Sequence, residues 1–286
     1  MRIEKPAETE VPPHFFYALG HSEQELQRLS RQGSTFEPFT RQLFTEAGIS
    51  GGMRVLDIGS GSGDVSLLVA DLVGLDGEVV GVDRESTAIR WANARAHSRG
   101  MRNVKFVQGD PAKMDFVRPF DAIVGRLVLM YYPNPVETIR NLSRHLRPGG
   151  LLVFQEIDVA NCGSYPPAPI FDRAVAWIKA AFSATGARIE QGLELYPLFL
   201  AAGLPAPSLR LDSLIGGGPD CVAYEHIAGV VRSLLPAIEM LKIATASEIQ
   251  ISSLAQRIRD EVVAQEAVVL SPALIGAWSR KVHIEG

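Results

Sequence analysis

The residues best suited to chemistry in this 286-residue chain form a glycine-rich segment, Val55-Leu56-Asp57-Ile58-Gly59-Ser60-Gly61-Ser62-Gly63-Asp64. An apolar stretch that predicts a strand precedes the glycines, and an amphipathic pattern that predicts a helix follows them. Glycines at alternate positions allow a tight turn and a close approach to a ligand, because no Cβ is in the way. Such a loop predicts a cofactor site at the carboxyl end of a sheet. The spacing alone is also compatible with a purely structural turn.

Acidic residues end the next two predicted strands. Asp83 ends the strand predicted over 78–83, and Asp110 ends the one predicted over 103–110. A carboxylate at the first position can accept from two vicinal ribose hydroxyls, and one at the second can accept from the exocyclic amine of adenine. A single acid at a strand end is usually a solvated cap. A glycine loop and two acids at three successive strand ends instead favour an adenosyl-containing cofactor.

From Arg54 to Asp158 this arrangement resembles the class I S-adenosylmethionine-dependent methyltransferases. Nucleotide-dependent dehydrogenases prefer Gly-x-Gly-x-x-Gly, whereas this chain has Gly-x-Gly-x-Gly with an acid two residues before the first glycine. The resemblance implies S-adenosylmethionine as cofactor and in-line transfer of its methyl group to O, N or C of a small molecule. It also implies these cofactor contacts: Asp57 at the ammonium group, directly or through water, Gly59, Ser60 and Gly61 beneath the cofactor, Asp83 at the ribose, and Asp110 with Pro111 at the adenine.

Two arginines lie beside these positions. Arg84 follows Asp83 where many relatives have an apolar residue, and its guanidinium can stack on adenine. Arg126 lies just past the strand predicted over 120–125, where it can reach the cofactor carboxylate or hold an anionic acceptor. The segment FDAIVGRLVLMYYPNP resembles the fourth strand and following loop of the family. We therefore expect Tyr131 and Tyr132 at the acceptor site.

An oxygen or carbon acceptor benefits from a general base, worth about 10²–10⁴ in rate. The candidates are His14, His21 and Glu156, with His226 less favoured. The family commonly folds its amino-terminal segment over the active site, which also places Tyr17 among the expected acceptor contacts.

Glu156 and Asp158 alternate with Ile157 in a predicted strand and should therefore point to one face. One expectation is that the two carboxylates orient a cationic acceptor, with Asp158 in contact with the substrate. The other is that both are hydrogen-bonded polar groups at a strand end.

The elements that must position these residues alternate between strand and helix, which predicts an α/β fold with a doubly wound, mostly parallel, Rossmann-like sheet. The strands are expected at 55–58, 78–83, 103–110, 120–125 and 151–158. The helices between them are expected at 64–73, 86–99 and 134–146, the last ended by Pro148-Gly149-Gly150.

The flanking regions are predicted to be mainly helical. Two short helices are expected within 14–50, and residues 1–50 are interpreted as an amino-terminal helical lid. Residues 51–286 are expected to form the methyltransferase domain, with helical insertions at about 160–188 and 216–266 that cover the acceptor or form a dimer surface. The later elements are expected as helices at 170–184, 190–202, 222–244 (broken near Pro236) and 247–264, and as strands at 208–215 and 268–281.

Composition narrows the functional classes. The formal net charge is −4 and there is no basic run, which argues against a nucleic-acid partner. There is no secretory signal pattern and no apolar run long enough to span a membrane, so a cytoplasmic enzyme is expected. The acceptor is expected to be a small molecule, of natural-product or quinone-like type. The sequence leaves open whether the chain forms a homodimer. A non-enzymatic S-adenosylmethionine binder and an NAD(P)-dependent oxidoreductase are the alternatives.

Overall fold

The computed structural model describes residues 23–282, with side chains from residue 33 onward. Its centre is a seven-stranded sheet in which the first five strands are parallel and β10 runs antiparallel to both of its neighbours. The doubly wound α/β prediction is therefore confirmed. In spatial order the strands are β3 (Val104–Gln108), β2 (Glu78–Asp83), β1 (Arg54–Ile58), β4 (Phe120–Arg126), β5 (Leu146–Asp158), β10 (Ala273–Arg280) and β7 (Ser208–Asp212).

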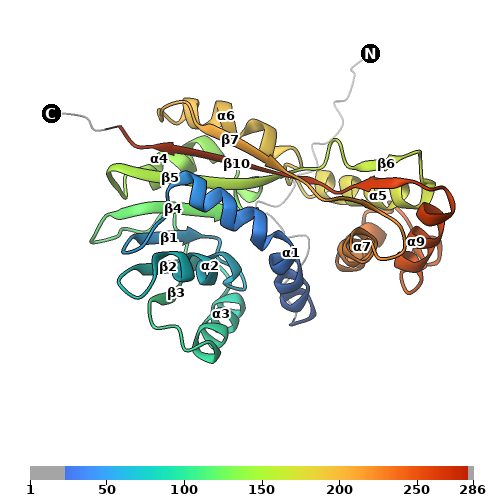
Figure 1. The fold of residues 1–286 in the computed structure, drawn as a ribbon, viewed down its shortest axis with the longest axis horizontal. Coiled ribbons are helices and arrows are strands. Elements are labelled where there is room, and N and C mark those ends of the chain that lie inside the picture. The colour runs from blue at the N-terminus through green and yellow to red at the C-terminus, as the bar shows by residue number, and fades with distance from the viewer. Residues whose placement is uncertain (1–22, 283–286) are drawn as a thin grey trace, which may run out of the picture.

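Helices cover both faces of this sheet (Figure 1). Successive side chains along β1 pack against different helix layers: Val55 packs with one set of helices and Leu56 with the other. One layer consists of α1 (Glu23–Ala47), α2 (Asp64–Val73) and α3 (Ser86–Ser98). The other consists of α4 (Pro135–Ser143) and α6 (Gln191–Ala201). The strand order reverses between β1 and β4, which is where a doubly wound sheet binds its ligands.

The amino-terminal part of the described chain is one helix, so the prediction of two helices within 14–50 is wrong. α1 continues through Gly33 and contains Pro38. Both residues disfavour a helix interior. Burial of Phe36, Leu43 and Phe44 offsets that cost, because each of these side chains is at most 3% exposed.

A second group of elements lies at one end of the molecule, beside the sheet (Figure 1). Its helices α5, α7, α8 and α9 share a hydrophobic core of their own, and we call this group the cap. Their bounds are α5 (Pro169–Ala184), α7 (Ala223–Met240), α8 (Ala246–Ile249) and α9 (Leu254–Ala264). A small antiparallel sheet completes the cap, in the order β6 (Gly163–Tyr165), β9 (Val268–Leu270) and β8 (Ile215–Gly217).

Several predicted boundaries in this half of the chain are wrong. α7 passes through Pro236 without a break, since Leu234 and Ile238 on either side of it are buried in the core of the cap. The single helix predicted over 247–264 is two helices, α8 and α9, with Gln250 in a left-handed conformation between them. Within residues 23–282, no helix is both long and apolar enough to cross a membrane.

Two predicted late strands are each divided. The strand predicted over 268–281 is interrupted at Ser271-Pro272, and its halves β9 and β10 join different sheets. The strand predicted over 208–215 likewise divides into β7 and β8. Pro148-Gly149-Gly150 lies inside β5 rather than ending the preceding helix, because the pairing of β4 with β5 is irregular there and accommodates it.

Candidate functional site

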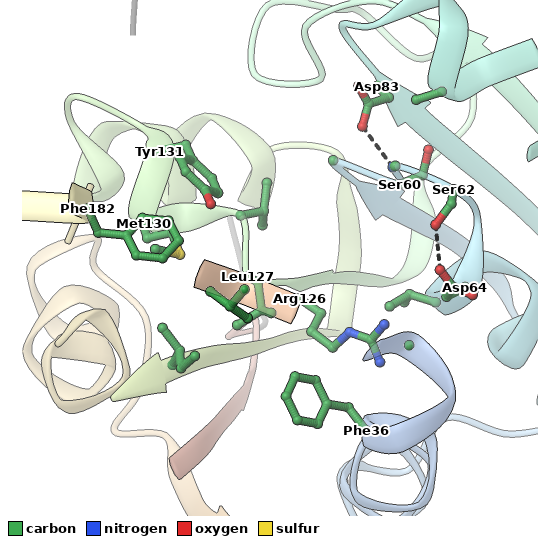
Figure 2. Close-up of a pocket in the computed structure, with 18 of the residues that line it drawn as sticks. Phe36, Ser60, Ser62, Asp64, Asp83, Arg126, Leu127, Met130, Tyr131 and Phe182 are labelled. Atoms are coloured by element: carbon green, nitrogen blue, oxygen red, sulfur yellow. Dashed lines mark hydrogen bonds between the residues drawn. The ribbon is translucent and has the colours of Figure 1, made fainter. Parts of the chain in front are cut away.

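A cavity of about 310 Å³ opens at the carboxyl ends of β1, β2 and β4. This volume lies in the range of small-molecule sites. Figure 2 shows Ser60, Ser62 and Asp83 on one side of the cavity and Met130 and Phe182 on the other. The cavity therefore has a polar half at the glycine loop and an apolar half toward the cap.

The glycine loop needs its glycines. Gly59, Gly61 and Gly63 have φ values of +62°, +50° and +86°, a region that disfavours other residues. A Cβ on Gly59 would lie 2.4 Å from a methyl carbon of Val128 in the loop after β4. At Gly61 the same position is open, with nothing within 4 Å. The glycine loop thus packs closely against the loop after β4 on one side and leaves its backbone accessible to a ligand on the other.

Asp83 lies where the sequence predicted it, at the end of β2 and on the cavity wall. Its carboxylate accepts hydrogen bonds from the backbone N–H of Gly61 at 2.8 Å and of Glu85 at 2.9 Å. These bonds fix the carboxylate over the glycine loop, and each oxygen keeps a second lone pair for a ligand hydroxyl. Beside it, the hydroxyl of Ser60 is buried and has no hydrogen-bond partner among the described residues.

Asp57 is placed beneath the loop rather than in it. It is 1% exposed, accepts from the hydroxyl of Ser66 at 2.5 Å, and is not among the described residues that line the cavity. Burial raises the pKa of this carboxyl to about 7. Of the two expected modes of contact with a cofactor ammonium group, direct and through water, this position suits the one through water. Asp57 also ties the end of β1 to α2 through the hydroxyl of Ser66.

Arg84 and Asp110 form an ion pair at 2.9 Å. The Arg84 guanidinium also lies over the ring of Tyr132, 5.0 Å from its centroid. Arg84, Tyr132 and Pro111 line the cavity, whereas Asp110 does not. The aromatic ring on which Arg84 stacks is thus that of Tyr132, and the Asp110 carboxylate is shared with Arg84. Burial raises the pKa of Tyr132 to about 12, so it stays a neutral donor.

Arg126 extends from the end of β4 toward the start of α2, beside Phe36 (Figure 2). It donates to the hydroxyl of Thr40 at 3.0 Å, and that hydroxyl donates in turn to the Gln155 side chain at 2.7 Å. Burial lowers the pKa of the Arg126 guanidinium, so its charge is incompletely solvated and an anionic ligand would stabilise it. Asp64, whose charge acts on Arg126, is itself paired with Arg95 at 2.8 Å.

The apolar half of the cavity was not predicted from the sequence. Phe36 of α1 is buried, and its ring lies on the cavity wall. Further apolar wall residues come from the end of β5 and from the cap, among them Ile157, Val159, Ile178, Phe182, Ile227 and Val230. No local pattern distinguishes them from core residues, since the same helical spacing serves both purposes. Tyr131 lines the cavity as expected.

Glu156 and Asp158 are buried rather than exposed in the cavity. Glu156 is fully buried and accepts from the backbone N–H groups of Val128 at 2.9 Å and Leu129 at 2.8 Å. It thereby holds the loop after β4, including the short helix η1 (Leu129–Tyr131). Asp158 is 2% exposed and accepts from the N–H of Ala160. Neither is among the described residues that line the cavity, so both positions suit a structural role.

The predicted amino-terminal contacts His14, Tyr17 and His21 lie outside the described residues. His226, the least favoured of the sequence candidates, lies on the cavity wall, with its ring 5.7 Å from that of Phe36 in an edge-to-face arrangement. The described residues contain no cluster of His, Cys, Asp and Glu able to hold a metal ion.

These residues fit an adenosyl cofactor. An open glycine backbone, a fixed carboxylate at Asp83 and an unpartnered hydroxyl at Ser60 provide the donors and acceptors that a ribose and its neighbours require. Bound S-adenosylmethionine would supply an electrophilic methyl group, and the protein's task is then to align an acceptor with it.

Comparison with known proteins agrees with this geometry. A family model described as "Methyltransferase domain" matches residues 49–203. The chain is 26% identical over 254 residues to the ubiquinone/menaquinone biosynthesis C-methyltransferase UbiE of Azotobacter vinelandii, covering 81% of this chain and 98% of that protein. It is 31% identical over 192 residues to UbiE of Pseudomonas putida, covering 65% of this chain and 72% of that protein. Among solved structures, YcgJ of Bacillus subtilis matches with a TM-score of 0.56 at 20% identity, over 86% of this chain and 99% of that one.

The structural likeness, at this low identity, supports the fold, and the family model supports the chemistry. Together they decide against an NAD(P)-dependent oxidoreductase, because the matching family model is that of a methyltransferase domain. The chain belongs to the methyltransferase-domain family and is an S-adenosylmethionine-dependent methyltransferase that acts on a small molecule.

Proposed function

We propose that the methyl acceptor is an apolar ring compound of the quinol type and that the methyl group goes to a ring carbon. The observation that carries this proposal is the apolar half of the cavity. Phe36 lines it from α1, and Ile178 and Phe182 line it from successive turns of α5. A flat, weakly polar ring buries its surface there at a gain of about 25 cal/mol per Å².

The names of the curated relatives support the same class of acceptor. Both UbiE proteins are named as C-methyltransferases of ubiquinone and menaquinone biosynthesis. A cationic or strongly polar acceptor fits this cavity less well, because its apolar wall offers such a group few partners.

In this proposal the polar half of the cavity holds the cofactor and the apolar half aligns the acceptor and excludes water. Holding the reacting atoms in line lowers the barrier by up to about 7–11 kcal/mol. Asp83 and the backbone of the glycine loop bind the adenosyl part, and Arg126 binds the carboxylate of the methionine part. The segment 1–50 and the insertions at 160–188 and 216–266 act as the cover of the acceptor site.

A direct test supplies trideuteromethyl-labelled S-adenosylmethionine with naphthohydroquinone, a catechol or a small primary amine as acceptor. We expect label in the quinol product, attached to carbon by nuclear magnetic resonance. Phe182→Ala should raise the KM for the quinol about tenfold, which corresponds to about 1.4 kcal/mol of binding. Leu193→Ala is the control, because Leu193 is exposed on α6 and does not line the cavity.

Transfer to the amine in preference to the quinol would contradict the proposed acceptor class. Tight binding of S-adenosylhomocysteine without transfer to any of the three would likewise contradict a quinol acceptor.

A further inference from the structure

His226 is the only histidine among the described residues that line the cavity. It lies in the first turn of α7, one residue before Ile227 and four before Val230, which also line the cavity. The edge-to-face contact with Phe36 holds its ring between α7 and α1. An imidazole is therefore fixed beside the apolar half, where the acceptor would bind.

The carboxylates on the described cavity wall, Asp64, Asp83 and Glu85, come from the polar half around the glycine loop and the end of β2. Asp83 accepts two backbone N–H groups, and Asp64 accepts from Ser62 and pairs with Arg95. Arg84 is paired with Asp110. Tyr132, with its pKa raised to about 12, does not accept a proton near neutral pH. Of the described groups on the cavity wall, the imidazole is the one suited to accept a proton from an acceptor in the apolar half.

We infer that His226 is the general base that removes the proton from a ring hydroxyl of the acceptor. The inference rests on the proposed function, since an apolar ring acceptor enters neutral and must ionise within the cavity. The hydroxyl proton passes to an imidazole nitrogen, and the electron pair left on oxygen raises the electron density of the ring. A ring carbon then forms its bond to the methyl carbon as the methyl–sulfur bond breaks and sulfur keeps that pair.

The remaining step restores the ring. The methylated carbon loses its hydrogen as a proton to water, its bonding pair returns to the ring, and the imidazolium returns the first proton to the oxygen. The sum is one methyl group gained by carbon, one proton released and one neutral thioether formed.

The test compares two acceptors of different acidity. Naphthohydroquinone must be deprotonated by the enzyme, whereas hydroxynaphthoquinone is already ionised at neutral pH. We expect His226→Gln to lower kcat for the quinol by about 10²–10⁴ and to lower it less than tenfold for the ionised acceptor. Affinity for S-adenosylhomocysteine, measured by calorimetry, should stay within about twofold. His97→Gln is the matched control, because His97 is exposed on α3.

Equal losses for both acceptors, or no loss for either, would overturn the assignment. If the wild-type enzyme does not turn over the ionised acceptor, a chemical rescue experiment replaces this comparison. Imidazole added to the His226→Ala variant should restore turnover of the quinol. Failure to restore turnover overturns the assignment. A wild-type enzyme that methylates no quinol at all refutes the proposed function itself, which separates the two failures.

Discussion

The hydroxyl of Thr40 on α1 accepts a hydrogen bond from the guanidinium of Arg126, 3.0 Å away at the end of β4. Thr40 is fully buried and donates its own hydrogen bond to the Gln155 side chain, so one hydroxyl joins the amino-terminal helix to two neighbouring strands. The contact fixes the direction in which Arg126 enters the cavity. It makes α1 part of the binding site, although α1 precedes the first strand of the sheet.

Arg126 should recognise the carboxylate of the cofactor. We expect Arg126→Met to weaken S-adenosylhomocysteine binding by about 1.5–3 kcal/mol, the value of a hydrogen bond to a charged group. Binding of methylthioadenosine, which lacks the amino-acid part, should be unchanged. Calorimetric titration with both ligands measures the difference. Equal losses for the two would assign Arg126 to a different task, such as holding an anionic acceptor.

Thr40 should affect cofactor binding by positioning the guanidinium of Arg126. Thr40→Val removes the hydroxyl but keeps the volume, and we expect a smaller loss of about 1 kcal/mol that again affects S-adenosylhomocysteine and spares methylthioadenosine. Thr40→Ser is the matched control, because it keeps the hydroxyl that Arg126 contacts. A valine variant that binds both ligands like wild type would show that Arg126 needs no such support.

Asp83 should bind the ribose hydroxyls of the cofactor. Asp83→Ala removes the carboxylate that lies over the glycine loop, and we expect adenosyl ligands to bind about 1.5–3 kcal/mol more weakly. Methylthioadenosine and S-adenosylhomocysteine should lose equal amounts here, unlike at Arg126. The circular dichroism spectrum serves as the check that the variant is folded. Unchanged affinity in a folded variant would reject the ribose assignment.

The buried carboxyl of Glu156 should make stability depend on pH. Burial raises its pKa from the ordinary 4.5 to about 7, so a proton binds the folded state more tightly than the unfolded one. The resulting stabilisation is complete below pH 4.5 and is lost as the pH rises to about 7. The shift corresponds to at most about 3 kcal/mol.

Urea unfolding near pH 5 and near pH 8 measures this effect against Glu156→Gln, whose amide oxygen can still accept from Val128 and Leu129. We expect the wild type to lose stability relative to the glutamine variant between the two pH values. Asp57, which titrates in the same range, is present in both proteins and cancels in the difference. A stability difference that does not change with pH would show that Glu156 is not a strongly shifted group.

The sheet and the cofactor side of the site could be predicted because their signals are local. A glycine loop between a strand and a helix, and an acid at the end of the next strand, each occupy a few consecutive residues, and the parallel sheet brings them together. Asp83 and the glycines therefore lie where the sequence placed them. The ion pair between Arg84 and Asp110 was not foreseen, since it depends on the spacing of two strand ends.

The acceptor side could not be predicted because it depends on tertiary packing. Phe36, Phe182 and Val230 are far apart in the chain and follow the same helical spacing as core residues. Glu156 was a candidate base by its residue type, yet its neighbours on β5 bury it behind the loop after β4. Helix boundaries failed before Phe36, where one helix replaces the two predicted, and at Pro236; at both places buried apolar faces outweigh local propensity.

Alanine substitutions at two helical glycines distinguish an effect on the cofactor site from an effect on helix stability. A Cβ on Gly33 of α1 would lie 2.6 Å from the carboxyl carbon of Asp64, which Ser62 and Arg95 hold in place. A Cβ on Gly229 of α7 would meet nothing within 4 Å. We expect Gly229→Ala to stabilise the protein by about 0.5–1 kcal/mol, because alanine favours a helix. Gly33→Ala gains the same propensity but must push α1 away from the glycine loop.

The expected result for Gly33→Ala is therefore weaker binding of S-adenosylhomocysteine, by about tenfold, in a protein that is still folded. Thermal unfolding and calorimetric titration of the two variants side by side give both readouts. If Gly33→Ala bound the ligand like wild type and gained stability like Gly229→Ala, α1 would not be seated on the loop. The close approach at Gly33 is what lets the amino-terminal helix lie against the cofactor side of the cavity, so this substitution tests that contact without removing any polar group.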